Sequence, residues 1–467
     1  MDFRTETVEG LAQRVRDKEV SARELTQAAL DRIDLLNTRF NAFVAVDPIG
    51  ALEQADAVDE RLAAGEDVGP LAGIPLGVKD LEDAAGFVTT HGSPAHADDA
   101  PAPADSVLVA RLRAAGCIVI GKTNTPEYGW KGDTENQVFG ATLNPWGEGR
   151  SPGGSSGGSS AALAAGLVPL ATGSDGGGSI RIPSAATGLS GHKPSTGRVP
   201  GGGSEPANWW DLSVKGPMAR RIRDVAYVLD EVVAPEQTDL RSLPRPESSW
   251  RRALDDAHAP RRVGWTPNLG YGDVDDEVKE VCAKAVGVLA GLGTEVEEVD
   301  GPWDEDPVNQ WLMLTSTYNL RTLERFRDTE VWERMDPQLV GLMDWSRDHV
   351  LAVDFIRALD AAHYMNLALL ETFGEHDFLL APVCAGQTPA SGGMGTINGR
   401  EEANWVQFTY GFNMTRSPAG TVCAGFTSDG MPVGLQVIGP QHADAAVLRL
   451  VALLEDALDL DPLAPID

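Results

Sequence analysis

The sequence predicts an α/β fold in which helices cover both faces of a central, mixed and twisted β-sheet. Stretches whose apolar residues recur at helical spacing alternate along the chain with short apolar segments typical of buried strands. No fixed repeat period is present, which argues against a solenoid or a propeller. The chain has 467 residues, 42% hydrophobic and 23% charged, so it can bury a large core. We therefore expect one folded domain over residues 1–467.

The N-terminal quarter of the chain shows this alternation clearly. Apolar residues recur at helical spacing over residues 7–65, and Ser21, three residues before Glu24, has the pattern of a helix N-cap. The elements expected next are a buried strand over 74–81, an amphipathic helix over 105–115 and an apolar strand over 117–120.

The remaining elements follow from the same patterns. Residues 140–205 are rich in Gly, Ser and Pro, but the apolar segment 161–170 interrupts them, so this stretch is folded and is not a linker. Residues 215–345 alternate helices with short strands. Further expected elements are strands over 262–265, 378–382 and 432–438 and a closing helix over 445–458.

Composition excludes several classes of function. The formal net charge of -31 would repel nucleic acid. No run of about 18 apolar residues could span a membrane, and the N-terminus has no apolar leader. The four cysteines (Cys117, Cys282, Cys384 and Cys423) are scattered without a CxxC pair, which argues against a structural zinc site or a disulfide framework. We expect a cytoplasmic protein.

Two short motifs match patterns whose mechanism the context does not support. GCIVIGKT at 116–123 has the letters of a phosphate-binding P-loop, but a helix precedes Gly116 and the middle residues are apolar. GGSSG at 153–157 matches the GxSxG nucleophile elbow, but Pro145 and Pro152 prevent a central strand immediately before it. We therefore expect neither a P-loop nor an α/β-hydrolase elbow.

Three segments together indicate amide chemistry. They are GIPLGVKDL at 73–81, SPGGSSGGSSAA at 151–162 and TGSDGGGSIRIPSA at 172–185, and they contain Lys79, Ser155 and Ser179 respectively. In order and spacing these segments resemble the amidase signature family. Further matching blocks are GKTNTPEYG at 121–129, FGATLNPW at 139–146, GHKPSTGRVP at 191–200, KGPMARRIRD at 215–224 and DGMPVGLQVIGP at 429–440.

The resemblance implies a Ser–cisSer–Lys triad that cleaves amides without a cofactor or metal. Ser179 would be the nucleophile, Ser155 would follow a cis peptide bond and relay a proton, and Lys79 would be the base. Physical chemistry agrees with these roles, because burial lowers the pKa of a lysine and a serine needs a nearby base to become nucleophilic. The N–H groups of Gly176, Gly177, Gly178 and Ser179 would form an oxyanion hole.

Other residues in the matching blocks are expected to support the site. Asp175 and Arg181 match family positions and would orient the loop, with direct substrate contact by Arg181 left open. Ser156, Thr172 and Ser174 would hydrogen-bond around the site or act as structural caps. The chain departs from the family at Gly176, where many members have threonine. Without the threonine, the loop lacks a hydroxyl that could touch the substrate.

The resemblance also implies a division of the chain and of its functions. We expect an N-terminal helical segment over 1–65, a signature core over 70–225, a variable substrate-pocket region over 226–400 and core strands with a helix over 401–467. Pocket walls are expected from about 125–135, 200–212, 310–345 and 385–420. The aromatic residues in or near them either line an acyl site or belong to the core; they are Tyr128, Trp130, Trp209, Trp210, Trp311 and Trp345.

Two alternatives to a stand-alone amidase stay open. The A-type subunit of a glutamine amidotransferase has the same triad, but a glutamine usually follows its SIR segment, where this chain has Ile182. A catalytically inactive binding scaffold is the other, and the intact Lys79, Ser155 and Ser179 argue against it. The expected partners are a small-molecule amide and a second copy of the chain in a homodimer, with no nucleic acid and no membrane.

Overall fold

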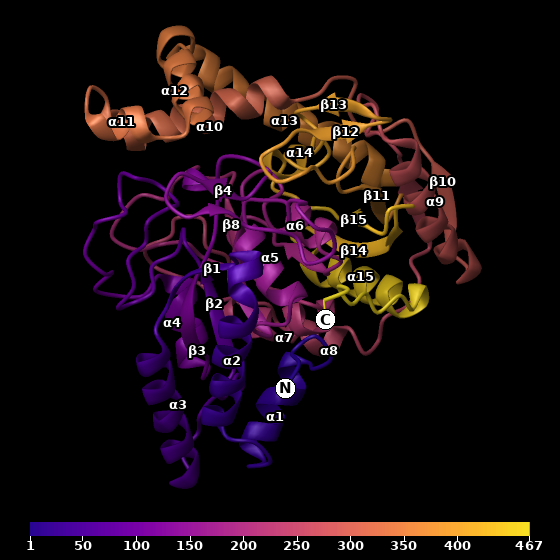
Figure 1. The fold of residues 1–467 in the computed structure, drawn as a ribbon. Coiled ribbons are helices and arrows are strands. Elements are labelled where there is room, and N and C mark those ends of the chain that lie inside the picture. Colours follow the sequence, from indigo (N-terminus) through magenta and orange to yellow (C-terminus); the bar gives the residue numbers. More distant parts are fainter. Residues whose placement is uncertain (467) are drawn as a thin grey trace.

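The structure is a computed structural model that describes residues 1–466 (Figure 1). The chain begins with α1 (Val8–Arg16), α2 (Ala22–Phe40) and α3 (Pro48–Ala63), which form the predicted helical segment. Ser21 caps α2 through a capping box with Glu24, as the sequence predicts. The short strand β1 (Phe43–Val46) separates α2 from α3 and was not expected, because four residues between two helices give too weak a pattern.

A five-stranded sheet carries the first part of the chain in the order β1-β3-β2-β6-β8. The strands β2 (Pro75–Lys79), β3 (Ile118–Thr123) and β6 (Leu170–Asp175) are parallel neighbours, whereas β1 and β8 (Val214–Ala219) pair antiparallel at the edges. Every residue of β2, β3 and β6 is buried, and each strand begins with apolar residues and ends in polar or charged ones.

A six-stranded sheet carries most of the remainder in the order β10-β9-β11-β15-β14-β7. The bounds are β7 (Gly191–Lys193), β9 (Arg262–Trp265), β10 (Glu295–Glu298), β11 (Phe378–Pro382), β14 (Ala419–Phe426) and β15 (Pro432–Ile438). The edge strands β7 and β8 contact each other, so the two sheets adjoin. The mixed α/β fold is thus confirmed, with most of its strands divided between two hydrogen-bonded sheets in place of one central sheet.

Helices pack against both sheets. α5 contacts β2, β6 and β8, whereas α9 and α15 contact the strands of the second sheet. Their bounds are α4 (Val107–Ala114), α5 (Gly157–Ala164), α6 (Arg181–Ala186), α7 (Ile222–Val232), α8 (Trp250–Ala253), α9 (Asp276–Gly291), α14 (Gly411–Met414) and α15 (Asp444–Leu458). The smaller elements are η1 (Glu127–Gly129), η2 (Glu324–Phe326), β4 (Glu135–Asn136), β5 (Gly140–Ala141), β12 (Gly395–Ile397) and β13 (Arg400–Glu402).

Four helices form a layer at the end of the molecule opposite α1, α2 and α3 (Figure 1). They are α10 (Val308–Leu323), α11 (Glu330–Arg334), α12 (Pro337–His349) and α13 (Ala352–Glu375). α10 packs against both α12 and α13, and α13 also contacts α14 and β11. No helix in residues 1–466 is long and apolar enough to cross a membrane.

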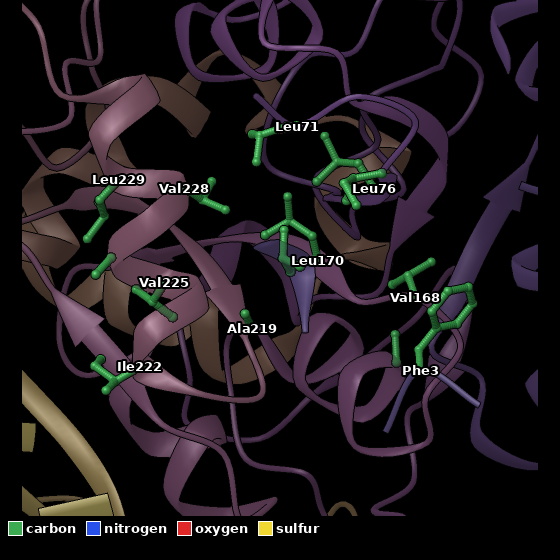
Figure 2. Packing of buried hydrophobic residues seen from close by; sticks show 14 of the residues in the cluster. Phe3, Leu71, Leu76, Val168, Leu170, Ala219, Ile222, Val225, Val228 and Leu229 are labelled. Atoms are coloured by element: carbon green, nitrogen blue, oxygen red, sulfur yellow. The ribbon is translucent and has the colours of Figure 1, made fainter. Parts of the chain in front are cut away.

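The main hydrophobic core joins the first sheet to the helices around it. Figure 2 shows Leu76 of β2 and Leu170 of β6 near Val225 and Val228 of α7, together with Phe3 from the N-terminus. All of these side chains are almost fully buried. Burial on this scale fixes the ends of β2 and β6, from which two of the predicted site residues project.

The structure also bears on the two misleading motifs. Residues 118–123 of the P-loop-like stretch form β3, and Lys122 is buried in an ion pair with Asp80 at 3.1 Å. A lysine held inside a strand and paired with a carboxylate cannot cradle a phosphate. The GxSxG-like stretch leads directly into α5, and no strand immediately precedes it within the described residues.

Candidate active site

Lys79 is the last residue of β2, and its side chain is fully buried. Its Nζ lies 2.8 Å from Ser155 Oγ, 2.9 Å from Ser156 Oγ and 3.0 Å from Ser174 Oγ. Burial lowers the pKa of this lysine to about 7, although the negative charges of Asp175 and Glu82 oppose the shift. Lys79 can therefore exchange a proton near neutral pH.

Ser155 lies in the glycine-rich turn that leads into α5. The Gly154–Ser155 peptide bond is cis, as the resemblance implies. Ser155 lines a cavity of about 620 Å³ together with Ser174 and Ser179. Ser155 thus contacts the buried lysine and also faces an open space.

Ser179 follows the three glycines after β6 and lies just before α6. The Ser156 N–H donates to the Ser179 carbonyl at 3.3 Å, which joins the two serine-containing loops. Ser179 lines both the cavity of about 620 Å³ and a second cavity of about 900 Å³. The three residues singled out from the sequence therefore converge on one place in the fold.

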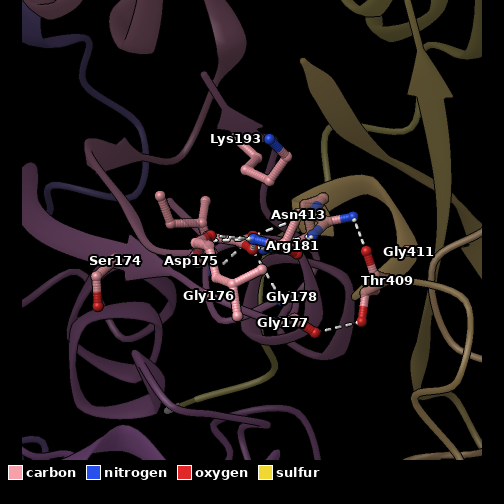
Figure 3. Close-up of polar contacts among 12 residues, drawn as sticks. Ser174, Asp175, Gly176, Gly177, Gly178, Arg181, Lys193, Thr409, Gly411 and Asn413 are labelled. Carbon is pink, nitrogen blue, oxygen red and sulfur yellow. Dashed lines mark hydrogen bonds and ion pairs between the residues drawn. The ribbon is translucent and has the colours of Figure 1, made fainter. Parts of the chain in front are cut away.

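A buried ion pair organises the glycine loop (Figure 3). Arg181 and Asp175 are both fully buried and pair at 2.9 Å. Arg181 also donates to the Thr409 carbonyl at 2.9 Å and to Asn413 Oδ1 at 2.7 Å. With further bonds to Gln436 and Asp175, its guanidinium is engaged on every side, and it lines neither cavity. Arg181 is therefore positioned to orient the loop and cannot contact a substrate directly.

The peptide groups of the glycine loop are held individually. Trp311 Nε1 donates to the Gly176 carbonyl at 2.9 Å, and Thr409 Oγ1 donates to the Gly177 carbonyl at 2.5 Å. The Gly178 N–H donates to Asp175 Oδ1 at 2.8 Å. This last bond corrects the expectation for Gly178, because an N–H already bound to a carboxylate is not free for an oxyanion.

Three of the predicted donors remain available. Within residues 1–466, the N–H groups of Gly176, Gly177 and Ser179 have no hydrogen-bond acceptor. Gly176 lines the smaller cavity, Gly177 the larger one and Ser179 both. Unpaired backbone donors beside a serine that faces open space are what an oxyanion hole requires.

An indole ring explains the glycine at position 176. A β-carbon added there would lie 2.5 Å from Cε3 of Trp209, closer than side-chain carbons approach in proteins. Trp209 is fixed by a 2.7 Å bond from its Nε1 to Asn319 Oδ1 and meets the Trp311 ring edge-on at 5.8 Å. Threonine at 176, as in many family members, would displace this ring.

The two cavities differ in character. The larger contains the indoles of Trp130, Trp209, Trp311 and Trp405, with Tyr410 stacked on Trp311 at 5.3 Å. The smaller contains both signs of charge, including Glu82 paired with Lys215 at 2.8 Å and the exposed guanidinium of Arg325. Trp209 lines both and lies where they adjoin.

The remaining expectations for pocket residues are partly met. Tyr128 is buried against the smaller cavity, stacked on His91 at 5.3 Å, and burial raises the pKa of its phenol. Of the other aromatic candidates, Trp130, Trp209 and Trp311 line a cavity, whereas Trp210 and Trp345 line neither. Ser156 binds Lys79 and does not line a cavity, which makes it part of the support for the lysine.

A second buried lysine is distinguished from Lys79 by its surroundings. Burial and the charge of Arg181 lower the pKa of Lys193 to about 7 as well. Its Nζ donates only to the Pro194 carbonyl among the described residues, at 3.1 Å, and the side chain lines neither cavity (Figure 3). Among the described residues, only Lys79 combines a lowered pKa with contact to a serine that faces a cavity.

The sequence did not single out several residues that build the site. Asn413 Nδ2 donates to two oxygens of Asp175, one of its carboxylate at 2.9 Å and its carbonyl at 2.7 Å. Asn413 and Thr409 lie more than 200 positions beyond Arg181, so no local spacing links them. Gln436 was noticed only as part of the block at 429–440.

Comparison with known proteins agrees with this geometry. The Amidase family model matches residues 24–448. The chain belongs to the amidase signature family. An acylamidase from Rhodococcus erythropolis is 39% identical over 457 residues, which cover 95% of this chain and 94% of that protein. The crystal structure of a bacterial aryl acylamidase of the amidase signature family has a TM-score of 0.92 and 29% identity, covering 99% of each chain.

A stand-alone amidase is favoured over the amidotransferase alternative. The A-type subunit of the glutamyl-tRNA(Gln) amidotransferase from Salinispora arenicola (strain CNS-205) is 36% identical over 475 residues, 96% of each protein. Ile182 lines the larger cavity, so an apolar side chain stands at the position where we expect a glutamine in an amidotransferase A-type subunit. The chain is an amidase, a hydrolase that cleaves amide bonds.

Proposed function

We propose that this amidase cleaves aryl amides through an acyl intermediate on Ser179, with Ser155 and Lys79 as proton relay and base. The observation that carries the proposal is the buried Lys79, whose Nζ lies 2.8 Å from Ser155 Oγ and whose pKa is lowered to about 7. A lysine with its usual pKa would be protonated at neutral pH and could not act as a base.

The hydrogen bonds around Lys79 suit both protonation states. A neutral amine has two N–H donors and one lone pair, so it can donate to Ser156 and Ser174 while it accepts the Ser155 proton. A charged ammonium can donate to all three hydroxyls. The lysine can therefore gain and lose a proton without rearrangement of its neighbours.

The proposed reaction has two stages. Ser179 Oγ attacks the amide carbon while its proton passes to Ser155 and the Ser155 proton passes to Lys79. The developing oxyanion would accept from the free N–H groups of Gly176, Gly177 and Ser179. The carbon–nitrogen bond then breaks as Lys79 returns a proton through Ser155 to the leaving nitrogen. Water, deprotonated along the same path, finally hydrolyses the acyl ester to the carboxylic acid.

The larger cavity supports an aryl substrate. Four indoles and Tyr410 offer flat faces on which an aromatic ring can stack at low cost in entropy. The similar acylamidase and aryl acylamidase bear names that agree with such a substrate. Since Ser179 lies between the two cavities, the two parts of an amide on either side of its carbonyl would each occupy one of them.

The remaining expectations about setting and partners stay predictions. They are a cytoplasmic location, a homodimer, and the absence of nucleic-acid, membrane, cofactor and metal partners. Within residues 1–466 no group of three or more His, Cys, Asp or Glu side chains is arranged to hold a metal ion. Activity that survives exhaustive dialysis against a chelator is the direct test of the metal-free reaction.

A serine-directed probe tests the nucleophile. A fluorophosphonate should label the wild type on the peptide that contains Ser179, as read by mass spectrometry, and should fail to label Ser179→Ala. Ser213→Ala, which removes another hydroxyl from the smaller cavity, is the matched control and should label normally. Hydrolysis of a nitroanilide should exceed that of acetamide or glutamine. Labelling that persists in Ser179→Ala would refute the assignment.

A further inference from the structure

Helix α13 has apolar side chains on a face that no part of residues 1–466 covers. Six large apolar residues of this helix are between 38% and 68% exposed: Val353, Ile356, Leu359, Tyr364, Leu367 and Leu370. They account for six of the sixteen large apolar side chains exposed anywhere in residues 1–466. Such a concentration marks an interaction surface more often than chance exposure.

The six residues lie on one side of the helix, in two groups of three that Asp360 and His363 separate. At about 100° per residue they span about 140° of the helix circumference. The buried Ala358 and Leu369 lie on the opposite side, where α13 packs against α10, α14 and β11. A helix that is apolar on both sides is normally buried on both sides. We call these six residues the α13 stripe.

The order of residues along the stripe is symmetric about its midpoint. From each end of the stripe, the apolar residues follow one another at steps of three positions towards the middle. The next residue inward is Asp360 from one end and His363 from the other. The resulting pairs are Val353 with Leu370, Ile356 with Leu367, and Leu359 with Tyr364. This order suits a two-fold dimer, in which residue i of one copy meets residue j of the other and j meets i, because apolar residues then lie opposite apolar residues.

We propose that the α13 stripe is the dimer interface of this amidase, in which α13 packs antiparallel against α13 of a second copy. A two-fold axis beside residues 361 and 362 brings the members of each pair to the same level along the helices. Six apolar side chains from each copy then leave water. The Asp360 carboxylate of each copy then lies at the same height along the helices as the His363 imidazole of the second copy. This imidazole can donate a hydrogen bond to the carboxylate.

Charge argues against a lipid surface as the occupant. The ionised groups on α13 are Asp354, Asp360, Glu371 and Glu375 against Arg357 alone, and the whole chain has a net charge of -31. Helices that lie on membranes carry lysine and arginine along the polar face and bind anionic lipid through them. The acidic flanks of this stripe instead favour a protein surface that supplies matching apolar residues.

The expected dimer is of moderate strength. The stripe extends over 17 helical rises, about 26 Å, which is a small contact for a protein interface. We expect a dissociation constant on the order of 1–10 µM at physiological ionic strength. The interface lies outside both cavities, so this inference does not depend on the amide chemistry.

Charge substitutions at one pair test both the surface and its register. Ile356→Glu and Leu367→Lys should each weaken self-association at least about 100-fold, because a two-fold dimer contains every substitution twice. An equimolar mixture of the two variants should form a heterodimer, in which one pair becomes Glu against Lys and the other stays Ile against Leu. Ile49→Glu, at an exposed site on α3, is the matched control and should dimerise like the wild type.

Sedimentation equilibrium between about 1 and 100 µM measures the association, and native mass spectrometry resolves the heterodimer in the mixture. The wild type should move from 49.6 kDa towards twice that mass, and the monomeric variants should keep amidase activity. A wild type that stays monomeric at the highest concentration would overturn the proposal. So would single variants that still dimerise, or a mixture in which no heterodimer forms. Binding of the monomeric wild type to phosphatidylglycerol vesicles, lost in Ile356→Glu, would instead assign the stripe to a membrane surface.

Discussion

The acid limb of the pH–rate profile should report the titration of Lys79. Its pKa of about 7 in the folded protein means that half of the molecules hold a neutral amine at about pH 7. The neutral fraction is about one eleventh at a pH one unit lower and about ten elevenths one unit higher. If only the neutral form is a base, kcat/KM should rise about tenfold between about pH 6 and 8 and then level off.

The direction of this pH dependence follows from the cause of the pKa shift of Lys79. Burial disfavours the charged ammonium, so acid converts the lysine to a form without an acceptor lone pair and the rate falls. Lys79→Arg keeps a positive charge at every pH of the assay and should lose activity by several powers of ten. Lys79→Ala should lose both the activity and the acid limb of whatever rate remains.

Lys193 offers a matched control for this experiment. Its pKa is also about 7 in the folded protein, but it contacts neither serine of the site. Initial rates of nitroanilide hydrolysis, measured from about pH 5 to 10, should therefore give the Lys193→Met variant the same acid limb as the wild type. A limb that moves or disappears in the Lys193 variant, or a Lys79→Arg enzyme that retains most of its activity, would refute the assignment of the base.

Three further predictions concern the glycine loop. Trp311→Phe removes the indole donor to the Gly176 carbonyl and should lower kcat about 2- to 13-fold with little change in KM, since one neutral hydrogen bond is worth about 0.5–1.5 kcal/mol; a change confined to KM would contradict this. Gly176→Thr should lower kcat/KM at least about tenfold because its β-carbon meets the Trp209 ring, and Trp209→Ala in the same chain should restore part of the loss. Arg181→Lys should lower the free energy of unfolding by about 2–5 kcal/mol, measured by urea titration, because the buried Asp175 loses a bidentate partner; an unchanged midpoint would show that the pair does not stabilise the loop.

Local patterns in the sequence predicted several of the elements, whereas the three central residues of the site followed from the resemblance to the amidase signature family and stay a prediction. The cap at Ser21, the apolar run that ends in Lys79 and the glycines before Ser179 each produce a structure that depends on neighbouring residues. The short strand β1 and the division of the strands into two sheets depend instead on tertiary pairing. A pattern of four residues does not determine such pairing.

The supporting residues could not be found in the same way, because they come from distant segments. Asn413 and Thr409 reach the glycine loop only after the chain has passed through four strands of the second sheet, β7, β9, β10 and β11. The occupied N–H of Gly178 depends on the rotamer of Asp175, which no spacing reveals. The Trp209 ring can pack over position 176 only because that residue is glycine. The sequence alone showed only that the threonine of many family members is absent there.

The buried charges around the loop explain how one lysine can be neutral while a carboxylate nearby stays ionised. The Asp175 carboxylate attracts a proton on Lys79 and so opposes the lowering of the lysine pKa. Arg181 lies closer to Asp175, pairing at 2.9 Å, and it holds the pKa of that carboxyl well below its usual range. Because the positive charge of Arg181 offsets the negative charge of Asp175, the field that reaches Lys79 is weakened and burial decides its protonation. The same carboxylate binds the Gly178 N–H, so one ion pair both shapes the glycine loop and lets the lysine hold the neutral amine that the proposed base needs.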